Sequence, residues 1–166
     1  MRLRQHLIIG GAAALALYFY YDWALWKTTL FFAATVMIDA DHYWDYLWRS
    51  KFADWSGWRM FRFSDWLKNN YDDKRYLAFS LLHTVEIFLL VYILARLWSG
   101  SFFMPILWGM FFHLFWDVVD LTYHKKPFLR AYSVIEYWLR KKSLLRRGIS
   151  PDTFYREIFD KSKRPV

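Results

Sequence analysis

Histidine and acidic residues recur together at the ends of the apolar segments of this 166-residue sequence. The groups are Asp39-Ala40-Asp41-His42, His83 with Glu86, His113 with Asp117, and His6 at the start of the first apolar segment. Ionisable groups in lipid-buried helices are costly, so they face the protein interior or a wet cavity and commonly mark function. Imidazole nitrogens and carboxylate oxygens are ligands of zinc and of manganese. The pattern therefore predicts a divalent-metal site.

The spacing within each group fits one face of a helix. His113 and Asp117 are separated by four residues, and Asp39 and His42 by three. Side chains at these separations lie on the same side of an α-helix. On a regular helix Asp41 would point away from Asp39. Either the helix unwinds at this point, or Asp41 supports the ligands or lies on the surface.

Composition limits the class of protein. The sequence is 57% hydrophobic and 23% aromatic, which is more apolar than an ordinary soluble domain. The mean hydropathy is only +0.04 because a strongly charged remainder offsets the apolar segments. The absence of cysteine excludes disulfides, thiolate metal sites and a cysteine nucleophile.

Four apolar segments suggest membrane-spanning helices, which need about 20 residues, and the last two reach this length. They run from about Leu7 to Tyr21, from Ala24 into the Asp39 group, from Leu77 to Trp98 and from Phe102 to Tyr123. The first two are short and adjoining, which predicts a helical hairpin. A cleaved signal peptide at the N-terminus is the alternative, but aromatic residues stand where cleavage would fall.

Charge predicts the orientation of these segments. All of the 23 lysines and arginines except Lys27 and Arg96 would lie on one side of the membrane. The positive-inside rule then places both termini in the cytoplasm of a multi-pass inner-membrane protein. In that orientation the four segments bring their histidine and acidic groups to one depth, at the cytoplasmic face.

The predicted fold is therefore all-α, an integral membrane four-helix bundle over residues 1–126 with interfacial amphipathic helices. We expect an interfacial segment at about 44–76 and a basic amphipathic cytoplasmic tail at 127–166. Aromatic and basic residues alternate within 52–76, a pattern that also suits single-stranded nucleic acid. The flanking apolar segments favour a helix in the headgroup layer instead. We thus expect anionic membrane lipids as partners and no nucleic acid.

The order of these motifs, from about Arg4 to Tyr123, resembles the YdjM-like family of inner-membrane metal-dependent hydrolases. That family is distantly similar to the zinc-dependent phospholipases C, which bind several metal ions through histidine and acidic residues on helices. Ile38 stands where the family usually has proline. The resemblance implies metal ligands at His6, Asp39, Asp41, His42, His83, His113 and Asp117, with Glu86 as a further match.

These observations together predict a membrane-bound, metal-dependent hydrolase acting on a phosphoester in a lipid or lipid-linked substrate. We expect one to three divalent ions, zinc first and manganese or iron as alternatives, with Glu86 or Asp41 as general base. A transporter would also carry polar groups in the outer halves of its spans, which are apolar here. A structural metal site remains the third interpretation, and it would have every ligand position filled by the protein.

Overall fold

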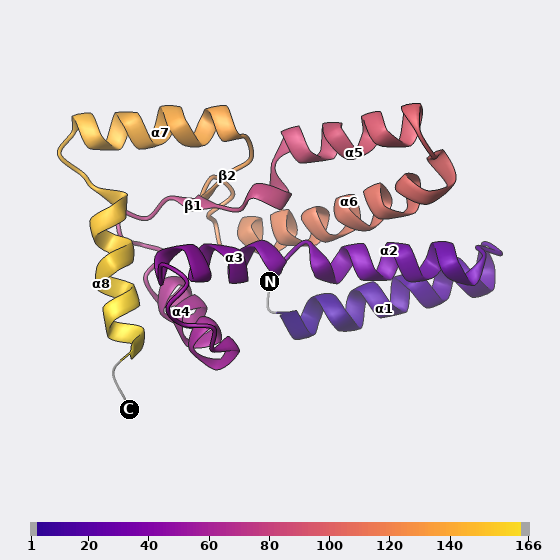
Figure 1. Cartoon of the computed structure of the whole chain (residues 1–166), viewed down its shortest axis with the longest axis horizontal. Helices are drawn as coiled ribbons and strands as arrows, with labels where there is room; N and C mark the ends of the chain where they lie inside the picture. The colour runs from indigo at the N-terminus through magenta and orange to yellow at the C-terminus, as the bar shows by residue number, and fades with distance from the viewer. Residues whose placement is uncertain (1–2, 164–166) are drawn as a thin grey trace. The chain divides into compact units, whose positions relative to one another are not determined.

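A computed structural model describes residues Leu3–Lys163 and confirms that the chain is predominantly α-helical (Figure 1). The helices are α1 (Leu3–Tyr20), α2 (Leu25–Met37), α3 (Ala40–Arg49), α4 (Gly57–Asn69), α5 (Val85–Leu97), α6 (Gly100–Tyr123), α7 (Val134–Arg146) and α8 (Pro151–Lys163). Two short strands, β1 (Ala78–Phe79) and β2 (Arg130–Ala131), and a 3-10 turn, η1 (Leu81–His83), complete the elements.

The chain divides into two compact units. Unit 1 contains the residues up to Ala40 together with Leu81–Pro127, and unit 2 contains Asp41–Ser80 together with the chain from Phe128 onward. Each unit therefore joins two segments that are far apart in the sequence. The segment expected at the membrane interface and the basic tail belong to the same unit.

Unit 1 consists of two helical hairpins. Helices α1 and α2 form one hairpin, which turns at Asp22 in the left-handed region (φ 51°), and α5 and α6 form the other (Figure 1). Helix α2 packs against both α1 and α6, so it is the central helix of the unit. The buried apolar core between the hairpins contains Ala34, Ile38, Phe88, Leu107 and Met110.

Two glycines allow the helices of unit 1 to approach closely. A Cβ atom at Gly10 of α1 would lie 2.5 Å from the hydroxyl oxygen of Thr35, and one at Gly109 of α6 would collide with the carbonyl oxygen of Phe31. Only glycine permits such close backbone contact, which is a common device between helices in membranes. Both approaches converge on the same stretch of α2, which fixes Thr35 between α1 and α6.

Two of the apolar helices, α2 and α5, are shorter than the sequence segments suggested. Among the described residues one helix, α6, is long and apolar enough to cross a membrane. Helices α2 and α5 have 13 residues each, about 20 Å at 1.5 Å per residue. The segment expected as a helix from Leu77 becomes α-helical only at Val85, because β1 pairs in parallel with β2 and needs extended backbone. The four-span interpretation therefore stays a prediction.

Unit 2 packs its helices around an aromatic core. Helix α4 lies against α8, and the core contains Tyr46, Phe63, Phe154, Tyr155, Ile158 and Phe159. The hydroxyl of Tyr155 donates a 2.8 Å hydrogen bond to the carbonyl oxygen of Leu77, and the guanidinium of Arg49 lies 3.6 Å from the centre of the Tyr155 ring. These contacts join the segment before β1 to the C-terminal helix.

Candidate metal centre

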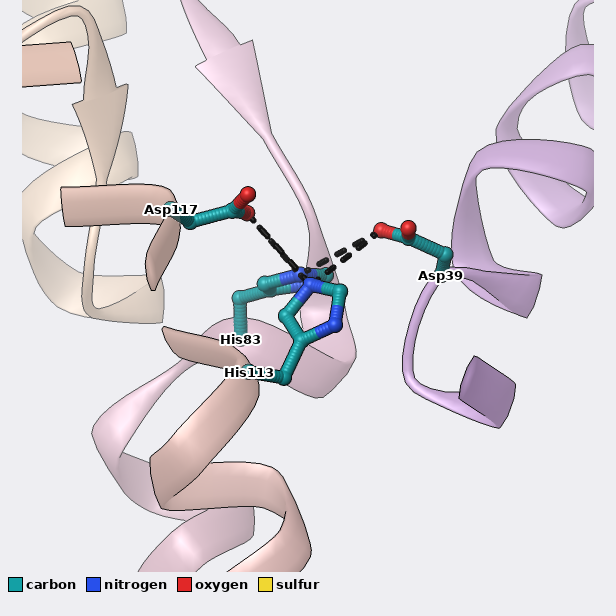
Figure 2. A group of neighbouring side chains, drawn as sticks. All are labelled: Asp39, His83, His113 and Asp117. Atoms are coloured by element: carbon teal, nitrogen blue, oxygen red, sulfur yellow. Dashed lines mark hydrogen bonds and ion pairs between the residues drawn. The ribbon is translucent and has the colours of Figure 1, made fainter. Parts of the chain in front are cut away.

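Four of the predicted ligands meet in unit 1: Asp39, His83, His113 and Asp117 (Figure 2). The Nε2 atoms of His83 and His113 lie 3.1 Å apart. Asp39 Oδ1 lies 3.6 Å from the first of these nitrogens and 3.4 Å from the second. Asp117 Oδ2 lies 3.6 Å and 3.5 Å from the same two atoms. Figure 2 shows the two imidazole rings between the two carboxylates.

These separations match the donors of a single small ion. Donors at 2.0–2.1 Å from a tetrahedral zinc lie about 3.3 Å apart, since a tetrahedron's edge is about 1.63 times its centre-to-corner distance. The five distances above fall between 3.1 and 3.6 Å. All four donor atoms lie within 4.8 Å of one another. The set therefore has the chemistry and the dimensions of a divalent-metal site.

The tautomer of His113 is fixed by a neighbouring backbone group. Its Nδ1 lies 2.8 Å from the carbonyl oxygen of Thr35 on α2. A carbonyl oxygen only accepts, so Nδ1 carries the proton and donates. A neutral His113 ring consequently has its lone pair on Nε2, the atom that faces His83 and both carboxylates. Metal-binding histidines are held by such a second hydrogen bond.

Burial makes charge balance at this site important. His83 and His113 are fully buried, and only 4% of the Asp117 side chain is exposed. Asp39 is the most accessible member, with 16% of its side chain exposed. Isolated buried carboxylates are strongly unfavourable. One divalent cation with two neutral imidazoles would neutralise both carboxylates, and solvent would reach it from the Asp39 side.

His6 lies beside this group without belonging to it. Its ring stacks on the ring of His113, with centroids 3.8 Å apart and planes at 16°. Its Nε2 lies 3.2 Å from Asp117 Oδ1, the carboxylate oxygen that does not face the other two histidines. This buried nitrogen makes no hydrogen bond of acceptable geometry. Asp117 therefore directs one oxygen to the four-donor group and the other to His6.

Two breaks in regular helix position the donors. Helix α2 ends at Met37, and Asp39 occupies the turn before α3 begins at Ala40. The helix is therefore unwound at Asp39, which is one of the two alternatives that the spacing of Asp39 and Asp41 left open. His83 ends the 3-10 turn η1 rather than lying inside a helix. His113 and Asp117 share a face of α6, as their spacing predicted.

The other predicted site residues lie outside the four-donor group. Asp41 and His42 are on α3 and belong to unit 2. Asp41 is buried, and its Oδ1 lies 3.9 Å from Nδ1 of the partly exposed His42. Glu86 is half-buried in the first turn of α5, within unit 1.

Sequence reasoning missed Thr35, whose contribution is a backbone carbonyl. Every residue has a backbone carbonyl oxygen, so the residue type does not indicate which one accepts a hydrogen bond from a metal-binding histidine. The only available hint was position, because Thr35 precedes Asp39 by four residues and so lies on the same side of the chain. Its own hydroxyl donates to the Phe32 carbonyl oxygen at 2.7 Å.

Comparison of the chain with protein-family models, with curated proteins and with solved structures finds no match. The geometry of the site therefore gives the indication of its chemistry. Two imidazoles, two carboxylates, near-complete burial and one accessible corner make a site that can hold a divalent cation beside solvent.

Proposed function

We propose that this protein is a membrane-bound, metal-dependent hydrolase that cleaves a phosphoester in a lipid or lipid-linked substrate. The observation that carries the proposal is the set of four donor atoms on Asp39, His83, His113 and Asp117, spaced for one divalent ion. A bound divalent ion lowers the pKa of a water ligand and polarises a phosphoryl oxygen. Zinc suits the nitrogen and oxygen donors best, with manganese or iron as alternatives.

The residues around the donors have separate tasks. Thr35 holds the His113 ring in the tautomer that presents Nε2. His6, stacked on that ring, steadies the second oxygen of Asp117 or adds a further ligand, which would allow a second ion. We assign the general base to Glu86, a carboxylate of unit 1 that lies outside the four donors.

The proposed membrane location rests on the outer surface of unit 1. Large apolar side chains are exposed along its helices, among them Ile8, Leu15, Leu89, Leu90, Leu97 and Phe115. Soluble monomers rarely expose such extended apolar surface, so it needs a lipid or protein covering. We propose that unit 1 inserts its four apolar helices in the inner membrane, with both termini and the metal centre on the cytoplasmic side. Anionic headgroups would then contact the basic segments.

A structural metal site is the second candidate, and one observation favours it. Structural zinc sites have all four positions filled by protein, whereas catalytic sites keep one open. Here four protein side chains already supply donor atoms within 4.8 Å of one another. In the hydrolase, the ion must accept a fifth ligand or loosen Asp39, whose side chain is the most exposed of the four.

The test separates these two functions with the full chain in detergent. Release of phosphate or headgroup is measured across a panel of phospholipids and lipid-linked phosphates, with metal present and after chelation. Asp117→Asn removes a donor, and Asp120→Asn is the matched control on the same helix, where the side chain is 31% exposed. Helicity is followed in parallel.

The hydrolase predicts turnover that chelation and Asp117→Asn abolish, while Asp120→Asn retains it and the helices persist. A purely structural ion predicts loss of helicity on chelation and no product with any substrate. Product that survives both chelation and Asp117→Asn would contradict the assignment of the reaction to this centre.

A further inference from the structure

Unit 1 contains an apolar pocket that the metal centre does not explain. The pocket has a volume of about 450 Å³ and lies among α1, α2 and α6. Every lining residue is alanine, leucine, phenylalanine or tryptophan, including Ala13, Ala16, Phe31, Trp108 and Phe112. The volume is within the range of small-molecule sites, about 300–1,000 Å³.

Helix α2 connects this pocket to the metal centre. Phe31 lines the pocket, and Thr35, one turn further, accepts the hydrogen bond from His113. Asp39 follows in the turn just after α2 and supplies a donor atom. Residues four apart lie on one face of a helix, about 6 Å apart along its axis. The pocket thus leads along α2 to the site.

Helix α1 makes the same connection. On α1, His6 and Ala13 are seven residues apart and share a face, so the stripe that lines the pocket ends beside Asp117. On α6, Trp108, Phe112 and Phe115 line the pocket from one face of the helix, whereas His113 and Asp117 lie on another face. The Phe112 ring contacts the Phe31 ring, with centroids 5.6 Å apart. Helices α1 and α2 therefore carry pocket residues and site residues in succession along one face.

The volume of the pocket favours a hydrocarbon chain over a peptide helix as its occupant. A three-turn helix about 10 Å across and 16 Å long occupies about 1,200 Å³, well above the pocket volume. A single hydrocarbon chain is narrow enough, and it matches a lining of aromatic and aliphatic carbon. The α6 wall is open to the exterior, since the Trp108 and Phe115 side chains are exposed. A chain can therefore enter sideways from a surrounding bilayer.

We propose that this pocket binds one hydrocarbon chain of a lipid whose anionic head lies at the metal centre. The position of the head rests on the proposed function, whereas the position of the chain does not. Burial of hydrocarbon strengthens binding by about fourfold per methylene, so affinity should rise with chain length until the pocket is filled. The substrate class is then a single- or multiple-chain lipid phosphoester selected by one chain.

The experiment fills the pocket from α1. Ala13→Leu combined with Ala16→Leu adds side-chain volume to the lining, and Ala12→Leu is the matched control, because Ala12 is exposed on the same helix and does not line the pocket. The probe is a phosphatidic acid with a photoreactive diazirine near the end of one acyl chain. The full-length protein is labelled in detergent micelles, and the modified peptides are identified by mass spectrometry. Ala16→Leu alone replaces the double variant if the latter does not fold.

The expected result is labelling concentrated on Phe111–Phe115 and Ala13–Leu17, reduced at least fivefold in the filled variant and unchanged in Ala12→Leu. Labelling spread evenly over the exposed faces, or equal in the filled variant and the control, would overturn the proposal. Metal content is measured in all three proteins and should not change.

A second measurement distinguishes failure of this inference from failure of the proposed function. Phosphate esters with the same head and chains of increasing length are compared as substrates. Turnover that is insensitive to chain length in wild type would overturn the pocket assignment and leave the hydrolase intact. Localised labelling without turnover of any ester would support the chain site and contradict the hydrolase.

Discussion

The Nδ1 atom of His113 donates a 2.8 Å hydrogen bond to the carbonyl oxygen of Thr35. This single contact orients the imidazole so that Nε2 faces His83, 3.1 Å away, and the carboxylates on either side. The geometry of the metal centre therefore depends on how closely α6 approaches the backbone of α2. That approach requires glycine at position 109, where a Cβ would collide with the Phe31 carbonyl oxygen, and Gly10 brings α1 equally close to Thr35.

Gly10→Ala should destabilise unit 1 and weaken its metal centre. The added Cβ would lie 2.5 Å from the Thr35 hydroxyl, so α1 or Thr35 must move. Overpacking of this kind costs about 1–3 kcal/mol. Thermal unfolding and metal affinity measure the effect.

Gly11→Ala is the matched control for that substitution. A Cβ at Gly11 would be 3.7 Å from its nearest neighbour, a ring carbon of Phe32, which is ordinary contact. Alanine is favoured over glycine in a helix by about 0.5–1 kcal/mol, so this variant should be as stable as wild type or slightly more so. Equal behaviour of the two variants would contradict the close α1–α2 contact.

Unit 2 should lose stability in acid partly through Asp73. Hydrogen bonds from the Arg75 guanidinium lower the pKa of the Asp73 carboxyl below its usual value. Because the folded-state pKa lies below the unfolded-state value of about 3.9, the stabilisation is present above that pH and disappears as the pH falls through the folded-state pKa.

Asp73→Asn removes this contribution. The difference in melting temperature between wild type and Asp73→Asn should be largest at neutral pH and should shrink below about pH 4, near the unfolded-state pKa. The scans are run at saturating metal, so that protonation of the metal ligands does not dominate. A difference that stays constant from neutral pH into acid would show that Asp73 acts through packing rather than charge.

The proposed topology can be tested with reporter fusions. A reporter fused at Gly100, the first residue of α6, should show the activity of a periplasmic location, and one fused at the C-terminus should show that of a cytoplasmic location. The expected orientation follows from the position of nearly all lysines and arginines on one side. A C-terminal fusion active in the periplasm would reverse the orientation and remove the cytoplasmic site.

The residue types of the metal centre could be predicted from the sequence because buried histidine and acid are rare in apolar segments. Asp39, His83, His113 and Asp117 were all among the candidates. The local backbone could not be predicted as well. The 3-10 turn at His83 closely follows β1, whose pairing with β2 is a long-range contact that no local pattern encodes.

The sequence also did not predict which segments pack together in unit 2. The segment 41–80 and the chain from Phe128 onward share one core, in which Phe63 on α4 meets Phe159 on α8 with ring centroids 5.9 Å apart. Each element has its own amphipathic pattern, but that pattern does not identify its partner. Charge and aromatic content alone made these segments look like separate surface helices.

The most direct test of the account is the metal content of the purified full chain. After equilibration with zinc and removal of unbound ion, wild type should retain one equivalent at the Asp39–His83–His113–Asp117 centre, with more only if His6 helps to bind a further ion. His83→Ala combined with Asp117→Asn should retain none there, because two of the four donors are lost. His124→Ala, which changes an exposed histidine just after α6, should bind as wild type. Wild type that retains no ion, or a double variant with unchanged content, would contradict the metal centre.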